Sequence, residues 1–167
     1  DLYKALSAAG VDYMEVGYKN SPKLLKGNGS GPWRFLNDDF LKEVIPQKTA
    51  TKLSALVDIG RVDENDILDR SESHLDLIRV ACYIKDVDKA LELVRKFHDR
   101  GYETTINIMA LSHVLEPELL EAFQMINDSP VDVVYIVDSY GSLDYKDIYY
   151  LTEKFKKHLP NKILGVH

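Results

Sequence analysis

The chain has 167 residues, of which 45% are hydrophobic and 29% are charged, and its formal net charge is −6. This balance is typical of a folded globular protein, and the acidic sign argues against a nucleic-acid partner, which a basic surface would match. A single cysteine excludes a disulfide framework and a cysteine-built zinc site, and no apolar run approaches the roughly 20 residues of a membrane span. We therefore expect a cytoplasmic protein with no membrane partner.

Residues 2–10 have the pattern of an amphipathic helix that Gly10 closes. Short apolar runs then recur along the chain and predict strands at 13–18, 51–58, 76–82, 103–109, 131–138 and 162–166. These runs are too apolar for strands with one face in water, so we expect a sheet that is covered on both sides.

Amphipathic helices are predicted between the later strands, at 86–97, 116–126 and 143–155. Asp86 stands where it could cap the first of them, and Pro117 lies in the first turn of the second. Strands that alternate with helices in this way indicate parallel pairing with right-handed crossovers, and therefore an α/β fold.

Two α/β folds fit this alternation. A doubly wound open sheet fits the length, whereas a (β/α)₈ TIM barrel fits the rhythm but needs roughly 250 residues for eight units. The sequence begins inside a helix with no strand before it, and it ends on a strand with no helix after it. We expect a single partial TIM-barrel domain over 1–167, comprising about strands 2 to 7 and lacking strand 1 and strand 8.

Polar residues fall at or near the carboxyl ends of the predicted strands, where barrel enzymes carry their chemistry. Glu15 lies inside an apolar strand and needs a partner, because an unpaired buried carboxylate is costly. The others have simpler readings as turn residues, helix caps or a structural histidine. They are Asp58, Asn107, Asp138, Ser139 and His167.

Several segments resemble, in order and spacing, the HMG-CoA-lyase-like metal-dependent aldolases, which are also called DRE-TIM metallolyases. The nearest type is 4-hydroxy-2-oxovalerate aldolase. The resemblance covers most of 8–167 and is weakest over 19–75. The segments that carry it are "AAGVDYMEVGY" (8–18), "RVACYIKD" (79–86), "INIMALSHV" (106–114), "VDVVYIVDSYGSL" (131–143) and "ILGVH" (163–167).

The resemblance implies a (β/α)₈ barrel with one divalent metal at its carboxyl-terminal mouth, Mn²⁺ or Mg²⁺, with Zn²⁺ as a third option. In the family the metal is held by an Asp of a first-strand Asp-Arg motif and by both histidines of a His-x-His pair. His167 matches the first of these histidines, whereas the other two ligands have no counterpart in this sequence. We expect the 167 residues alone to be inactive and to bind metal poorly.

The resemblance also implies roles for other residues. Glu15 matches a strand-two Glu that supports the water shell of the metal, and Asp138 and Ser139 match a strand-six pair that faces the site. These three are the expected catalytic residues. The expected substrate-binding residues are His113, which matches a Ser-His after strand five, together with Arg34 and Asn107. For Arg34 a surface salt bridge stays an alternative to a bidentate contact with a substrate carboxylate.

Two other chemistries have weaker support. The glycine-rich stretch 26–35 lacks the G-x-G-x-x-G spacing of a dinucleotide loop, and we expect a loop across the barrel mouth with Trp33 and Arg34 as anchors. A Schiff-base aldolase needs a lysine at the carboxyl end of a strand, whereas Lys52 and Lys162 stand where strands begin.

The sequence therefore predicts a divalent-metal-dependent aldolase or lyase that makes or breaks a C–C bond next to a 2-oxo acid such as pyruvate, through a metal-stabilised enolate. Its substrates would be a small 2-oxo acid and an aldehyde, and its protein partner a second copy or a dehydrogenase. Two alternatives stay open: a Claisen-type synthase that joins acetyl-CoA to a 2-oxo acid, and a catalytically silent barrel that serves as a binding module.

Overall fold

The computed structural model describes residues 1–25 and 30–167. All six predicted strands are present, as are the helices predicted at 2–10, 86–97, 116–126 and 143–155, and the helix α2 follows the glycine-rich stretch 26–35. The strands are β1 Tyr13–Tyr18, β2 Lys52–Asp58, β3 Leu77–Tyr83, β4 Glu103–Met109, β5 Val133–Ile136 and β6 Ile163–Val166. The helices are α1 Leu2–Ala8, α2 Asp38–Val44, α3 Val87–Asp99, α4 Glu116–Asn127 and α5 Tyr145–His158.

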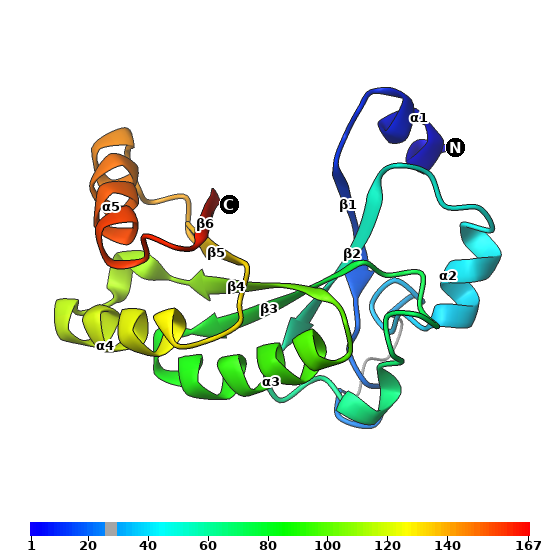
Figure 1. Ribbon diagram of the computed structural model, residues 1–167, viewed down its shortest axis with the longest axis horizontal. Coiled ribbons are helices and arrows are strands. Elements are labelled where there is room, and N and C mark those ends of the chain that lie inside the picture. The colour runs from blue at the N-terminus through cyan, green and yellow to red at the C-terminus, as the bar shows by residue number, and fades with distance from the viewer. Residues whose placement is uncertain (26–29) are drawn as a thin grey trace.

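The strands form one parallel sheet in the order β1-β2-β3-β4-β5-β6 (Figure 1). A doubly wound sheet reverses its strand order at a switch point, whereas successive strands of a (β/α)₈ barrel lie side by side in chain order. The predicted fold, an α/β sheet with the topology of part of a TIM barrel, is therefore confirmed.

One face of the sheet packs against the helices and forms the hydrophobic core. Ile78 and Val80 of β3 and Ile106 and Ile108 of β4 are fully buried there. They belong to the same core cluster as the predicted apolar stripe of α3, which runs from Val87 to Phe97. Figure 1 shows α3 and α4 running along this side of the sheet. Each such aliphatic side chain contributes roughly 1.5–3 kcal/mol through its burial.

The opposite face of the central strands is also buried, but the buried side chains on it are polar. Successive residues of a strand point to opposite faces, so Ser54, Arg79, Thr105 and Asn107 all point away from the helices. Each of the four is no more than 9% exposed. The central strands are thus buried on both faces, as expected, and the candidate site described below lies on the second face.

The start of α3 differs from the expectation in one respect. Asp86 occupies the N-cap position, but its side chain makes no capping hydrogen bond. Its carboxylate instead forms an ion pair with Lys89, 2.6 Å away and three residues further along the chain. The position was predicted correctly and the interaction was not.

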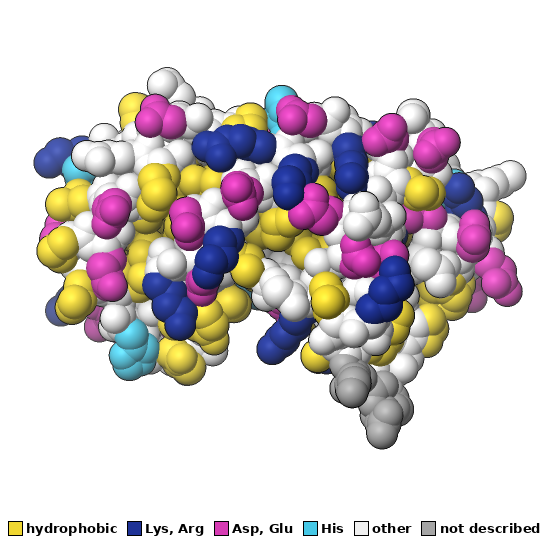
Figure 2. Space-filling view, turned by 90° about the horizontal axis from the view of Figure 1, so that it is seen from below, with side chains coloured by type: hydrophobic (Ala, Val, Ile, Leu, Met, Phe, Trp, Pro, Cys, Tyr) yellow, Lys and Arg dark blue, Asp and Glu magenta, His cyan; other side chains and the backbone are white. Residues whose placement is uncertain are grey.

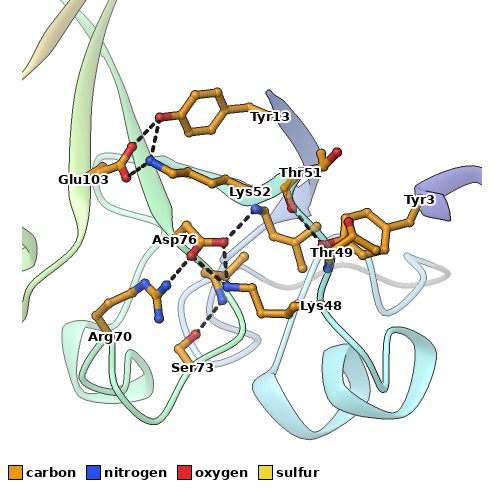
Figure 3. A network of polar contacts seen from close by, with 12 residues as sticks. Tyr3, Tyr13, Lys48, Thr49, Thr51, Lys52, Arg70, Ser73, Asp76 and Glu103 are labelled. Atoms are coloured by element: carbon orange, nitrogen blue, oxygen red, sulfur yellow. Dashed lines mark hydrogen bonds and ion pairs between the residues drawn. The ribbon is translucent and has the colours of Figure 1, made fainter. Parts of the chain in front are cut away.

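A polar network ties the amino ends of the strands together (Figure 3). The buried carboxylate of Asp76, just before β3, accepts hydrogen bonds from Lys48 Nζ at 2.6 and 2.7 Å and from the backbone N–H of Leu53 at 2.9 Å, and it also pairs with Arg70. Because Leu53 belongs to β2, Asp76 links the start of β3 to its neighbour strand. The register of these two strands is therefore supported by a charged group as well as by the ladder.

The surface seen in Figure 2 carries acidic and basic side chains in close alternation rather than in separate patches of one sign. None of the helices in the described part of the chain combines the length and the apolar composition that a bilayer crossing requires.

Candidate functional site

A cavity of about 280 Å³ lies on the polar face of the sheet. Strands β1 to β5 contribute to its lining, and His167 joins them from directly after β6. Its charged and aromatic lining residues are Tyr13, Glu15, Arg79, Glu103, Asp132, Tyr135 and His167. Glu15 and His167, which the sequence assigned to the site from opposite ends of the chain, therefore face one cavity.

Glu15 has the partner that its place in an apolar strand required. Its Oε2 accepts a hydrogen bond from Nη1 of Arg79, at 2.5 Å. Arg79 lies on β3 and reaches across β2, where the small side chain of Ser54 is the direct neighbour of Glu15 in register. The side chain of Glu15 stays 35% exposed, whereas that of Arg79 is only 11% exposed. The carboxylate can thus meet both its arginine and a ligand.

A β-bulge follows Glu15 directly, because the register of β1 against β2 shifts between Glu15 and Gly17. Gly17 has φ +150°, and a Cβ there would lie 2.1 Å from the carbonyl oxygen of Trp33. That carbonyl accepts a hydrogen bond from the N–H of Tyr18, 2.7 Å away. The bulge therefore needs glycine, and bulges of this kind re-aim the side chains beside them.

Arg79 also packs on an aromatic ring. Its guanidinium carbon lies 4.8 Å from the ring centroid of Tyr135, which belongs to β5. The same ring occupies the space beside Gly165 of β6, where a Cβ would approach the ring carbons to between 2.5 and 2.9 Å. Residues of β1, β3, β5 and β6 are thereby brought into one stack across the polar face.

His167 continues the ladder beyond β6. Its N–H donates to the carbonyl of Ile136 at 2.9 Å, and its carbonyl accepts from the N–H of Asp138 at 2.9 Å. Its side chain is exposed and lines the cavity. The backbone is thus held on the β5 side while the imidazole faces the cavity.

The two remaining predicted catalytic residues, Asp138 and Ser139, organise loops and do not line this cavity. Asp138 accepts hydrogen bonds from the N–H groups of Ser142 and Leu143, at 3.0 and 3.1 Å. Desolvation raises the pKa of Asp138, but hydrogen bonds from the backbone N–H groups of its own loop outweigh it and hold the pKa below its ordinary value. Ser139 accepts from the N–H of Ala110 at 3.0 Å.

The predicted substrate-binding residues are scattered. His113 is exposed after β4, and its ring meets that of Tyr140 edge to face at 5.3 Å. Asn107 is buried, and its Oδ1 accepts a hydrogen bond from Thr105 at 2.9 Å. Arg34 is exposed and lines neither this cavity nor the second one described below. Of the predicted mouth loop, residues 26–29 lie outside the described residues.

A second cavity, of about 490 Å³, lies at the carboxyl ends of β1 to β4. Its lining includes Tyr18, Tyr83 and Met109, and also Asp58, which pairs with Arg61 at 3.1 Å. Cys82 contributes to the wall, but burial raises the pKa of its thiol to about 12, with the nearby acidic residues adding to the effect. The thiol is therefore a packing group rather than a nucleophile.

The described residues around the cavity supply only part of a metal centre. His167 offers one imidazole donor on the cavity wall, and Glu15 offers a carboxylate that is already engaged by Arg79. Within residues 1–25 and 30–167 no group of three or more His, Cys, Asp or Glu side chains is placed to hold a metal ion. Divalent cations of this kind need more donors than these two positions provide.

Arg79 and Tyr135 were not selected from the sequence. The signal for Arg79 was present, because a charged residue inside the apolar run "LIRVACY" needs a partner for the same reason as Glu15 does. No comparable signal marks Tyr135, since an aromatic residue in a strand is more simply read as core. Only the folded structure shows that Arg79 contacts both Glu15 and Tyr135.

Several curated proteins resemble the chain in sequence at low identity. No protein-family model matches the chain. It is 26% identical over 170 residues to a 4-hydroxy-2-oxovalerate aldolase from Thermus thermophilus and 28% identical over 172 residues to one from Shewanella woodyi. It is 23% identical over 138 residues to an oxaloacetate decarboxylase from Mycobacterium tuberculosis.

These alignments cover 99%, 99% and 82% of the chain, but 48%, 49% and 40% of the three relatives. The chain thus spans about half the length of the curated relatives it matches. The solved N-terminal domain of a proposed aldolase from Bacteroides vulgatus superposes with a TM-score of 0.68, over 98% of this chain and 57% of that one, at 22% identity. That likeness supports the fold. The resemblance to the HMG-CoA-lyase-like metal-dependent aldolases that the sequence predicted is confirmed by these relatives.

Proposed function

We propose that the protein is a divalent-metal-dependent lyase that makes or breaks a C–C bond next to the carbonyl of a small 2-oxo acid, with an aldehyde as the second substrate. One observation carries the proposal: Glu15 and His167, the two residues that the family resemblance assigns to the metal and its surroundings, face the same cavity. The similarity of nearly the whole chain to 4-hydroxy-2-oxovalerate aldolases supports it.

A divalent cation bound at this site would supply Lewis acidity, which stabilises the negative charge that develops on the carbonyl oxygen of a 2-oxo acid. Among the described residues, His167 would provide one ligand, and further ligands would have to join it. Glu15 would accept hydrogen bonds from water or substrate through the oxygen that Arg79 does not engage. Asp138 and Ser139 would hold the loops after β4 and β5 in place.

The assay follows deuterium entering the methyl group of pyruvate by NMR, with and without Mn²⁺, in the full-length gene product. Metal-dependent exchange that His167→Ala abolishes is the expected result, because exchange at this carbon reports formation of the enolate. Metal binding without exchange of pyruvate or other small 2-oxo acids would favour the Claisen-type synthase. A protein that binds no metal would favour the silent barrel.

Decarboxylation is a second candidate, supported by the similarity to an oxaloacetate decarboxylase. Loss of CO₂ from oxaloacetate breaks the bond between C3 and C4 and leaves the electron pair in the enolate of pyruvate. Aldol cleavage of a 4-hydroxy-2-oxo acid leaves the same enolate and releases an aldehyde instead. Production of pyruvate from oxaloacetate, measured beside the exchange assay, would distinguish an enzyme that cleaves this acid from one that acts only on the hydroxy acid.

A further inference from the structure

We propose that Arg79 is a positioning residue for Glu15, and that Tyr135, seated in the space left open by Gly165, holds Arg79 in place. The proposal rests on the role given to Glu15 above. It also gives the Gly-x-His sequence at 165–167 a double use, since His167 lines the cavity while Gly165 makes room for the aromatic ring.

The first step of the argument is the burial of Arg79. Its side chain is 11% exposed, so its charge is mostly removed from water and must be compensated within the protein. Among the described residues, two interactions compensate this charge. Nη1 donates a hydrogen bond to the Glu15 carboxylate, and the guanidinium makes a cation–π contact with the ring of Tyr135. Nε is buried and has no hydrogen-bond partner among the described residues.

The second step is the geometry of these two contacts. Glu15 is on β1 and Tyr135 is on β5, and these strands are not neighbours in the sheet. Arg79, on β3 between them, contacts one strand with its donor group and the other with its face. A cation–π contact with a tyrosine fixes the plane of the guanidinium. The direction of the Nη1 donor, and hence of the Glu15 carboxylate, follows from that plane.

The third step is the dependence of Tyr135 on Gly165. These two residues are directly paired in the β5–β6 register. A Cβ at 165 would lie 2.5 Å from Cε1, 2.7 Å from Cδ1 and 2.9 Å from Cζ of the ring, closer than real Cβ atoms approach. The ring therefore leans over the glycine backbone, which is where it meets Arg79.

Positioning matters because Glu15 is a flexible side chain with a third of its surface in solvent. Without Arg79 its carboxylate would sample several rotamers. With Arg79 it presents Oε1, for which no partner is found among the described residues, in a single orientation on the cavity wall. Residues that orient a group beside a metal site typically change activity or metal affinity by 10–100-fold when they are removed.

The first test is structural and needs no activity. Crystal structures of the full-length gene product and of its Arg79→Met and Tyr135→Leu variants would compare the Glu15 side chain. We expect a single conformer in the parent protein, and a displaced or multiple conformer in each variant. A Glu15 carboxylate that keeps its position in both variants would overturn the proposal, even if the protein proves to have another function.

The second test uses the rate of pyruvate deuterium exchange. We expect Arg79→Met to lower kcat by roughly 10–100-fold with little change in KM, Arg79→Lys to lower it less, and guanidinium ion to restore part of the rate of Arg79→Ala. Lys96→Met is the matched control, because it breaks an ion pair with Glu64 and neither residue lines the cavity. A loss of rate as large in the control, or a kcat that Arg79→Met leaves unchanged, would overturn the proposal.

The two tests separate the possible failures. If the parent protein catalyses no exchange, the proposed function fails, and the crystal structures still decide whether Arg79 positions Glu15. If Arg79→Met does not fold, Arg79→Lys and Tyr135→Leu carry the comparison, since the first keeps the charge and the second leaves the ion pair in place.

Discussion

The guanidinium of Arg79 lies 4.8 Å over the ring of Tyr135, and through this contact two strands that are not neighbours in the sheet are joined across its polar face. The ring can lie there only because position 165 carries no side chain. The glycine two residues before His167 is thus explained by packing, independently of any chemistry of the histidine.

Replacing Gly165 with alanine is expected to destabilise the protein. The added methyl group would overlap the ring of Tyr135, so the ring must move or the backbone of β6 must shift. Overpacking of this kind costs about 1–3 kcal/mol, and the free energy of unfolding from urea titration should fall by that amount.

Gly31→Ala is the matched control, because a Cβ at Gly31 would meet no atom of the described residues within 4 Å and the residue has no left-handed φ. We expect no loss of stability there, and a gain is allowed by the reduced freedom of the unfolded chain. The double variant Gly165→Ala with Tyr135→Leu should lose less free energy of unfolding than the two single variants lose together. Additive losses would show that the ring does not determine the effect of Gly165.

Asp76 is expected to make stability depend on pH in the acid range. Burial raises the pKa of its carboxyl, but the hydrogen bonds from Lys48 and from the N–H of Leu53, with the charges of Lys48 and Arg70, outweigh burial and lower the pKa below its usual 3.8. A carboxyl whose pKa is lower in the folded state stabilises that state above its unfolded pKa and loses this contribution as the pH falls. The free energy of unfolding should therefore decline below about pH 4.

The measurement is urea unfolding of the parent protein and of Asp76→Asn at pH 7 and at pH 3.5. At pH 7 the variant should be less stable by about 3 kcal/mol, because Lys48 and Arg70 lose a largely buried partner. The difference should shrink at pH 3.5. Glu153→Gln, which breaks an exposed ion pair with Lys156, should change stability by less than about 1 kcal/mol at either pH. An equal pH dependence in parent and Asp76→Asn would exclude Asp76 as its source.

The predictability of this fold rests on a feature of parallel sheets. Runs such as "LIRVACY" and "ETTINIM" are buried on both faces, so they stand out as strands, and amphipathic stripes such as the one from Val87 to Phe97 mark the helices between them. The α2 helix is expected after the glycine-rich stretch 26–35, but its bounds are hard to predict because its seven residues carry little apolar pattern.

The site was less predictable, because it depends on partners that are distant in sequence. Glu15 needed a partner, but 64 positions separate it from Arg79, and only the register of three strands shows that they meet. Asp138 follows a strand, as the sequence predicts, and its catalytic role stays a prediction. Its neighbours in the sequence could not show that its oxygens are used by the N–H groups of its own loop.

Removing the side chain of Asp138 is expected to loosen the loop after β5. In Asp138→Ala the N–H groups of Ser142 and Leu143 lose their acceptor, at a cost of about 1 kcal/mol. Amide hydrogen exchange measured by NMR should become faster at these two residues and stay unchanged at Phe97 in α3, which is fully buried. Unchanged exchange at both loop residues would mean that the carboxylate does not organise the loop.

Metal binding by the 167 residues alone is expected to be weak. A divalent cation such as Mn²⁺ gives up hydration water only for several well-placed donors, and His167 provides a single imidazole on the cavity wall. Glu15 is held by Arg79, and the described residues contain no group of three acidic, histidine or cysteine side chains suited to a metal.

Isothermal titration of the 167-residue chain with Mn²⁺ should therefore show no saturable one-to-one binding below roughly 1 mM, and His167→Ala should leave the small heats unchanged. Tight binding that His167→Ala removes would contradict this expectation, and it would mean that the carboxylates around the cavity rearrange to complete a site. Glu15→Gln would then identify the rearranging group, because Glu15 must leave Arg79 before it can reach a cation beside His167.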